Sequence, residues 1–435
     1  MPASLTSASA IAASNALAPA PQANAPAPAP AAAPVRASAS ASASAGALAR
    51  DSVCVSSLGQ FHMFELAQQL QRRRLLRRLY TATPRFLVRS LPKPQVRAFP
   101  WVYAPAKLLH RYGAPNLGAR LNFRAATTFD NWVARSLALE PCRIFHFLSS
   151  FGVRSHAEAR RRFGAVTICD RGSSHIAYQD DLLREEFARW GRPYEPIDPR
   201  VVERELAEYA SADYILVPSS FSERSFIERG IPRSKLRRAA YGADLSLFRG
   251  ASKVHNKFRV IYVGALTLQK GIPYLLEAVS RLQPQVELDL VGPASEEIRP
   301  FLAKYEGSFR YLGAKPKSEL WQHYSQASVF ALASIQEGFG LVMAQAMACG
   351  LPVIATENTG AADLFNDGVE GFIVPIRSAK AIQERLEFLL ANPQQLHKMS
   401  AAALKRVQSV GGWNSYGDAV EKLYAEALEE KQLVA

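Results

Sequence analysis

The segment with the clearest chemical potential is EGFGLVMAQAMACGLPVIATENTGAADLFNDGVEGFIVP, residues 337–375. It begins with Glu337 and a Gly338-Phe339-Gly340 turn, after which small residues predict a helix. Backbone N–H groups at a helix start are unpaired and carry roughly half a positive charge. Glycine lets a ligand come close to the backbone. The pattern therefore predicts a pyrophosphate site, with Glu337 at its lip to accept hydrogen bonds from sugar hydroxyls.

A residue later in the same helix points to the same site. Gln345 follows Glu337 by eight positions, about two helical turns below the turn and on a similar face. Another strand–glycine–helix element, YVGALTLQKGIPYLLEAVSRL, covers residues 262–282.

Together these segments resemble the signature of the retaining glycosyltransferases of family 4, also called group 1. That family has Glu-x7-Glu, then a helix ending in ACGLPVIA and a glycine turn. Here Glu337 is the first acid, but Gln345 replaces the second, which in the family is taken to contact the donor ribose. The Lys270-Gly271 pair matches the family's Lys-Gly, whereas Ala265 stands where an arginine is often seen.

The resemblance implies a set of donor-binding residues. Lys270 would neutralise the diphosphate leaving group as the glycosidic bond breaks, which makes Lys270 and Glu337 catalytic candidates. The predicted donor-binding residues are Gly264, Lys270, Glu337, Gly338, Phe339, Gly340, Leu341 and Gln345.

The resemblance also implies the reaction and the fold. The fold class is α/β with the GT-B architecture, in which two Rossmann-like doubly wound domains face each other across a cleft. The anomeric configuration is retained, and since no convincing nucleophile is visible, we expect same-face attack assisted by the leaving phosphate. A UDP-sugar donor is favoured over a GDP-sugar as a family tendency. No Asp-x-Asp occurs, and we expect neither a metal nor a cofactor beyond the nucleotide-sugar co-substrate.

Candidates in the N-terminal half lie where predicted strands end, because ligands of doubly wound sheets bind at the carboxyl ends of strands. Asp170 and His175 flank a strand–helix turn and are predicted to be catalytic: Asp170 orients the acceptor, and His175 bonds a donor hydroxyl or the acceptor. His146, on another strand, and Gly59 and Gln60, in the first strand–helix turn, are predicted to lie on the acceptor side.

Two series of short apolar strands and amphipathic helices position these residues. We predict an Ala/Pro/Ser-rich disordered tail over 1–50, an acceptor-side domain over 51–245, a nucleotide-sugar-binding domain over 246–412, and a helix crossing back over 413–435. The tail has 22 Ala, 8 Ser and 7 Pro in 50 positions and too few large apolar groups to offset its ordering entropy.

The formal net charge of +14 is concentrated in one region. Residues 66–129 hold 13 Lys or Arg and no Asp or Glu, and five of the arginines lie in QRRRLLRRLY. Such a surface attracts phosphate, so we expect a phosphorylated acceptor or an anionic membrane surface as partner, and no nucleic acid. With no apolar run of membrane-spanning length, the predicted location is the cytoplasm, with a peripheral position on the inner face of the cytoplasmic membrane as an option.

The function predicted is transfer of a sugar to a glycan, a lipid-linked sugar or a polysaccharide precursor such as that of a lipopolysaccharide or exopolysaccharide. Two alternatives stay open on the same fold: a non-catalytic relative that binds a nucleotide sugar or glycan, which the residues at 265 and 345 keep in play, and a nucleotide-sugar epimerase. A dinucleotide dehydrogenase is disfavoured because the first strand–helix turn lacks G-x-G-x-x-G.

Overall fold

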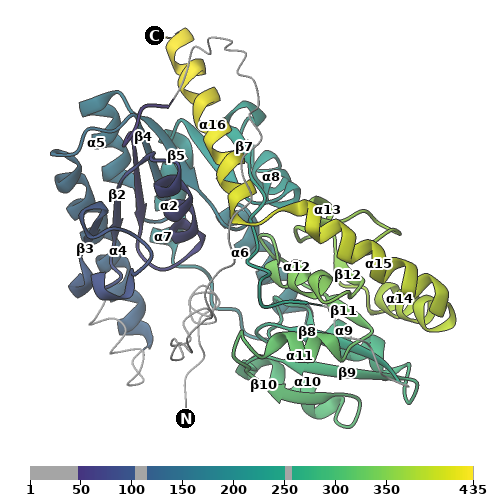
Figure 1. Ribbon diagram of the computed structural model, residues 1–435. Coiled ribbons are helices and arrows are strands. Elements are labelled where there is room, and N and C mark those ends of the chain that lie inside the picture. Colours follow the sequence, from purple (N-terminus) through teal and green to yellow (C-terminus); the bar gives the residue numbers. More distant parts are fainter. Residues whose placement is uncertain (1–47, 103–114, 250–256, 435) are drawn as a thin grey trace, which may run out of the picture.

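The computed structural model describes residues 48–102, 115–249 and 257–434. Two parallel sheets, each flanked by helices, form the two halves of the molecule (Figure 1). The strand orders are β3-β2-β1-β4-β5-β6-β7 and β10-β9-β8-β11-β12-β13. In both sheets the order reverses beside the first strand of the series, which is the switch point where doubly wound sheets bind ligands. The expected pair of doubly wound domains is confirmed.

The first sheet and its helices run from residue 53 to residue 238. Its strands are β1 (Val53–Ser57), β2 (Leu76–Thr81), β3 (Val96–Ala98), β4 (Ile144–Leu148), β5 (Val166–Asp170), β6 (Tyr214–Val217) and β7 (Leu236–Arg238). Its helices are α2 (His62–Arg72), α4 (Pro115–Leu137), α5 (Val153–Phe163), α6 (Ile176–Arg189), α7 (Pro199–Ser211) and α8 (Ser220–Ile227).

The second sheet and its helices begin at residue 258. Its strands are β8 (Phe258–Val263), β9 (Val286–Val291), β10 (Arg310–Gly313), β11 (Val329–Leu332), β12 (Val353–Thr356) and β13 (Gly371–Val374). Its helices are α9 (Ile272–Ser280), α10 (Arg299–Lys304), α11 (Leu320–Ser325), α12 (Leu341–Ala348), α13 (Ala361–Leu364), α14 (Ala379–Ala391) and α15 (Pro393–Val410).

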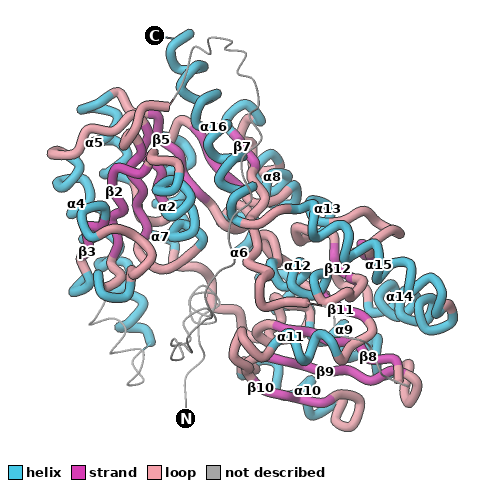
Figure 2. The backbone as a smooth tube through the Cα atoms, in the orientation of Figure 1, coloured by secondary structure: helices cyan, strands magenta, loops and turns pink. Residues whose placement is uncertain are grey.

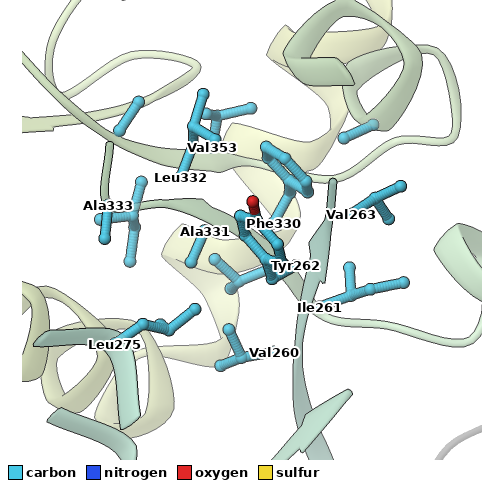
Figure 3. Close-up of a cluster of buried hydrophobic side chains, with 14 of the residues drawn as sticks. Val260, Ile261, Tyr262, Val263, Leu275, Phe330, Ala331, Leu332, Ala333 and Val353 are labelled. Atoms are coloured by element: carbon cyan, nitrogen blue, oxygen red, sulfur yellow. The ribbon is translucent and has the colours of Figure 1, made fainter. Parts of the chain in front are cut away.

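The central strands form because their residues are apolar almost throughout, as parallel strands covered on both faces require. In β8 and β11 the side chains of Val260, Ile261 and Phe330 are completely buried. They pack with Leu275 of α9 and Val353 of β12 in one continuous cluster (Figure 3). This rigid core fixes the loops that leave the carboxyl ends of the strands.

The last helix, α16 (Trp413–Val434), leaves the second half and packs along α2 and the first sheet (Figures 1 and 2). Its apolar face completes the core cluster there with Tyr416, Val420, Leu423 and Tyr424. No helix among the described residues is both long and apolar enough to cross a bilayer. Of the predicted disordered tail, residues 1–47 lie outside the described residues.

Candidate functional site

The start of α12 brings together a cation, a carboxylate and a glycine. Lys270 closes the loop after β8, and its Nζ forms an ion pair with Oε2 of Glu337, in the loop after β11. Both side chains stay partly exposed, at 17% and 22%. Gly340 caps α12 with a left-handed φ of 87°, and a Cβ there would lie 3.4 Å from Cγ of Glu337. These three groups thus meet at the start of one helix, where the side chains of Lys270 and Glu337 remain partly exposed.

A second glycine, Gly271, allows the loop that carries Lys270 to lie close to the end of β11. Gly271, with φ 63°, follows Lys270 and begins α9. A Cβ on it would lie 1.9 Å from the carbonyl oxygen of Ala333, at the end of β11. Only glycine therefore allows the loop carrying Lys270 to lie this close to the strand that leads to Glu337.

Gly264, Gln345 and Phe339 were also predicted to bind the donor, and their surroundings differ. Gly264 ends β8 with φ 148°, and its carbonyl lies against Gly292. Gln345 is partly exposed on α12, and its Oε1 accepts a 3.4 Å hydrogen bond from Tyr324. Phe339 is 3% exposed, and its carbonyl oxygen accepts a 2.9 Å hydrogen bond from the backbone N–H of Gly360.

Leu341 and Phe339 were predicted to contact the donor, but their side chains belong to the hydrophobic cluster of the first sheet. Leu341 packs at the edge of that cluster. The ring of Phe339 meets Tyr241 edge to face at 5.8 Å. Their side chains therefore join the two halves, which leaves only their backbone to serve a donor.

Gly338 has a different role from the one predicted for it. A Cβ at this position would lie 2.1 Å from the carbonyl oxygen of Gly172, in the loop after β5. Its own carbonyl accepts hydrogen bonds from the hydroxyls of Ser219 at 2.6 Å and Ser222 at 3.2 Å. The N-terminal half of the chain thus packs directly against Gly338.

Beside Gly338, two buried glutamines continue the contact between the halves. Gln269 donates to Oε1 of Gln336 at 2.7 Å. The amide of Gln336 donates to the hydroxyls of Ser173 at 2.6 Å and Ser174 at 3.0 Å, beyond β5. The carboxyl edges of the two sheets therefore face each other directly. The sequence gives no sign of this pairing, because the partners are more than 150 positions apart.

Asp170, at the end of β5, is 1% exposed and accepts hydrogen bonds from two histidines. Nε2 of His62, at the start of α2, lies 2.9 Å from Oδ1, and Nε2 of His146, on β4, lies 3.1 Å from Oδ2. The Tyr424 hydroxyl of α16 lies 2.6 Å from Nδ1 of His146. The ring of His62 stacks on Tyr241 at 4.5 Å.

This cluster changes the interpretation of two predicted residues. Asp170 and His146 are buried and hold each other, so neither is free to touch an acceptor in this arrangement. His62, which sequence reasoning missed, remains partly exposed, and Asp170 positions it. A search for polar residues just after the first strand–helix turn would have found it, because that turn lies at the same sheet edge as Asp170.

The carboxylate of Asp170 supports a prediction on stability. Burial alone would raise its pKa, but His62 and His146 outweigh burial and hold the pKa well below its usual range. A group of this kind stabilises the fold above its unfolded pKa of about 4, and the effect is lost as pH falls below that value. Asp170→Asn should cost about 3 kcal/mol of unfolding free energy near pH 7.5, since it removes the charge from two buried hydrogen bonds.

Urea denaturation of the wild type and the variant at pH 7.5 and pH 3 measures this effect. The difference between the two proteins should shrink at the lower pH. Asp181→Asn, at an exposed ion pair with Arg229, serves as the matched control and should change little. Equal stability of Asp170→Asn and wild type at pH 7.5 would contradict the role given to Asp170.

His175 is buried in the N-terminal half, and its predicted contact with a donor hydroxyl or the acceptor stays a prediction. It caps α6, is 3% exposed, and its ring lies against Tyr209 at 5.2 Å and Phe226 at 5.0 Å. Burial, and then the nearby Arg229 and Arg171, lower its pKa to about 4. The residue is a neutral part of the N-terminal core.

Gly59 and Gln60 lie in the turn after β1, as predicted. The carbonyl of Gly59 accepts a 2.9 Å hydrogen bond from Ser57. Gln60 is exposed, and its amide lies 3.5 Å from the carbonyl oxygen of Leu87, in the segment after β2. This turn and that segment therefore share one edge of the first sheet.

The second half of the chain matches a known protein family. Residues 246–406 match the model of the glycosyl transferases group 1. A similar curated protein is the amylovoran biosynthesis glycosyltransferase AmsK of Erwinia amylovora, 26% identical over 46% of this chain and 53% of AmsK. The putative colanic acid biosynthesis glycosyltransferase WcaL of Salmonella typhimurium is 29% identical over 41% of this chain and 48% of WcaL. The chain spans about half the length of the curated relatives it matches.

Solved structures resemble the chain over most of its length. Sucrose-phosphate synthase from Thermosynechococcus elongatus has a TM-score of 0.67 at 21% identity, covering 87% of this chain and 99% of that one. Anabaena HepE in complex with UDP has a TM-score of 0.63 at 16% identity, covering 86% and 100%. These similarities confirm the expected GT-B fold.

Proposed function

We propose that this chain, which carries a group 1 glycosyltransferase domain over residues 246–406, is an enzyme that moves a sugar from a nucleotide-sugar donor to an acceptor. The observation that carries the proposal is the meeting of Lys270, Glu337 and the capping Gly340 at the start of α12. A helix start beside a partly exposed lysine suits a diphosphate. The neighbouring carboxylate suits the sugar hydroxyls.

The same arrangement suggests how the chain's residues would act. Lys270 is partly exposed and forms an ion pair with Glu337. A diphosphate brings more negative charge than one carboxylate, so Lys270 would turn to it while Glu337 becomes free for the sugar. As the bond to the leaving phosphate breaks, Lys270 and the N–H groups of α12 would stabilise the developing charge.

The finer parts of the proposal are the donor base, the stereochemistry and the acceptor. We favour a UDP-sugar, and HepE, a structural neighbour, was solved with UDP and with UDP-glucose. We also propose retention of configuration, transfer without a metal, and a glycan, lipid-linked sugar or polysaccharide precursor as acceptor. The relatives named for amylovoran and colanic acid biosynthesis support the last of these.

Thermal unfolding with UDP and with GDP tests the donor site on the wild type. At 100 times its Kd, a ligand that binds only the folded state adds about 2.7 kcal/mol of stability. We expect UDP to raise the unfolding temperature and GDP to raise it less. A screen of UDP-sugars with a chelator present, followed by NMR of the product's anomeric proton, then tests metal independence and retention. The proposal would be wrong if neither UDP nor GDP stabilised the protein.

A second candidate function rests on two positions in the donor half. Gln345 and Ala265 replace residues that are charged in the family. They favour a chain that binds a nucleotide sugar or glycan without catalysis. Stabilisation by UDP with no release of UDP from any UDP-sugar, with or without acceptors, would favour this alternative.

A further inference from the structure

The segment after β2, residues 82–102 (hereafter the 82–102 loop, which includes the short strand β3), exposes large apolar side chains. Phe86 is 73% exposed, Trp101 is 78% exposed and Leu87 is 47% exposed. Phe86 and Leu87 are adjacent in the sequence, and neighbouring exposed apolar side chains mark a site of interaction. Aromatic rings of this kind are common where proteins meet the headgroup region of a bilayer.

The positive charge that the sequence places in 66–129 is distributed unevenly in the structure. On β2 and β3, Arg77, Arg78 and Arg97 all pair with the buried Glu140, and Arg73 of the same region pairs with Asp418 and Glu421 of α16. Ion pairs therefore hold these four arginines within the fold, although the three on Glu140 share a single carboxylate.

The 82–102 loop keeps cations that are not neutralised. Arg89 and Lys93 are exposed and have no acidic partner among the described residues. Arg85 donates to the carbonyl oxygens of Val88 and Leu91, which shapes the loop. The sequence has no acid from 66 to 129, so nothing within the loop itself opposes an anion.

These cations and apolar groups share one concave surface. An open hollow of about 560 Å³ is lined by Arg85, Phe86, Val88, Arg89, Leu91 and Lys93. Cationic and apolar side chains around one hollow match a lipid phosphate and the first part of its acyl chains. The exposed Phe86 and Leu87 would enter the bilayer beside it.

The position of this surface relates it to the acceptor side. The loop leaves the carboxyl end of β2, and the carbonyl of Leu87 lies 3.5 Å from the amide of Gln60, in the turn after β1. We propose that the 82–102 loop docks the protein on an anionic membrane surface. That the docked membrane also presents a lipid-linked acceptor rests on the proposed function, whereas docking itself does not.

Flotation of the full chain with vesicles tests the docking. Vesicles of phosphatidylcholine alone and of phosphatidylcholine with phosphatidylglycerol are compared. We expect binding to the anionic vesicles only, and its loss on raising the salt concentration. The double variant Arg89→Glu/Lys93→Glu should bind roughly 10- to 30-fold more weakly, because each cation near the surface contributes to attraction. Phe86→Ser/Trp101→Ser should also bind more weakly.

Two control variants match these changes elsewhere on the surface. Leu139→Ser replaces an exposed apolar residue, and Lys398→Glu reverses an exposed charge on α15. Both should bind vesicles as the wild type does. All variants should keep the wild-type unfolding temperature and the same stabilisation by UDP, so loss of docking is separated from unfolding and from failure of the donor site.

Three results would overturn the proposal. The first is that the wild type does not float with anionic vesicles. The second is that both loop variants float as the wild type does. The third is that the wild type binds neutral and anionic vesicles equally. A labelled single-stranded oligonucleotide is tested in parallel by fluorescence anisotropy. The surface would be a nucleic-acid site instead if the wild type bound the oligonucleotide but no vesicles, and if Arg89→Glu/Lys93→Glu lost that binding.

Discussion

Replacing Lys270 by alanine is expected to remove the stabilisation by a nucleoside diphosphate and to slow sugar transfer by about 10²–10³-fold. The side chain is the cation at the start of α12, where it pairs with Glu337. Without it, the charge that develops on the leaving phosphate is met by backbone dipoles alone. Thermal unfolding with UDP and initial rates of UDP release measure the two effects.

The unliganded variant should stay folded, since the Lys270–Glu337 pair is partly exposed and such pairs contribute about 1 kcal/mol or less. Lys380→Ala is the matched control, because Lys380 is 81% exposed and pairs only weakly with Glu384. Glu337→Gln should keep diphosphate binding and lose transfer, which separates the phosphate contact from the sugar contact. Undiminished stabilisation of Lys270→Ala by UDP would show that Lys270 does not touch the phosphates.

Gly338→Ala is expected to slow transfer by on the order of 10²-fold and to leave UDP binding intact. The new Cβ would lie 2.1 Å from the carbonyl oxygen of Gly172, which is backbone and has little freedom to move. The two halves must therefore separate at this contact, and the groups on the N-terminal side would lose their alignment with the donor. Lys270 and Gly340 are not displaced, so the diphosphate should still bind.

The assay combines UDP-dependent thermal unfolding with transfer to an acceptor. Gly412→Ala is a suitable control, because a Cβ there meets only the carbonyl oxygen of Ala243 at an ordinary 3.5 Å. Transfer by Gly338→Ala at the wild-type rate would mean that the contact with Gly172 is open during the reaction.

The strands that the sequence predicts best are the continuous apolar ones. β6, β11 and β13 consist almost entirely of apolar residues. Their residues are apolar because both faces are covered, so the pattern needs no knowledge of distant partners. The same physical reason accounts for the correct prediction of two doubly wound domains.

The elements that were missed depend on distant partners. β2 contains Arg77 and Arg78, which obscure it as a strand, and both pair with Glu140, about 60 positions later. α4 begins at Pro115, in a stretch where proline, arginine and aromatic residues hide the helical period. Charges that cancel only in three dimensions leave no local signal.

The candidate site also has one part that the sequence predicts and another that depends on distant partners. Lys270 and Glu337 were predictable because each lies in a segment with its own glycine turn, and the structure brings them together. The cluster of His62, His146 and Asp170 joins three segments, and its members show no relation in sequence until the strands are aligned. The contact of Gly338 with Gly172 could not be predicted, because glycine permits any close neighbour, whether a ligand or another part of the chain.

The path of α16 sets an order of events during synthesis. The core of the first sheet is complete only when Tyr416, Val420 and Tyr424 have packed on it. A ribosome that has finished β7 must still translate the whole second half before these residues emerge, which takes about 10–40 s at ordinary rates. Throughout that interval the apolar side of α2 is exposed to the cell, while the second half can already fold around its own core. The N-terminal half is therefore translated first but completed last.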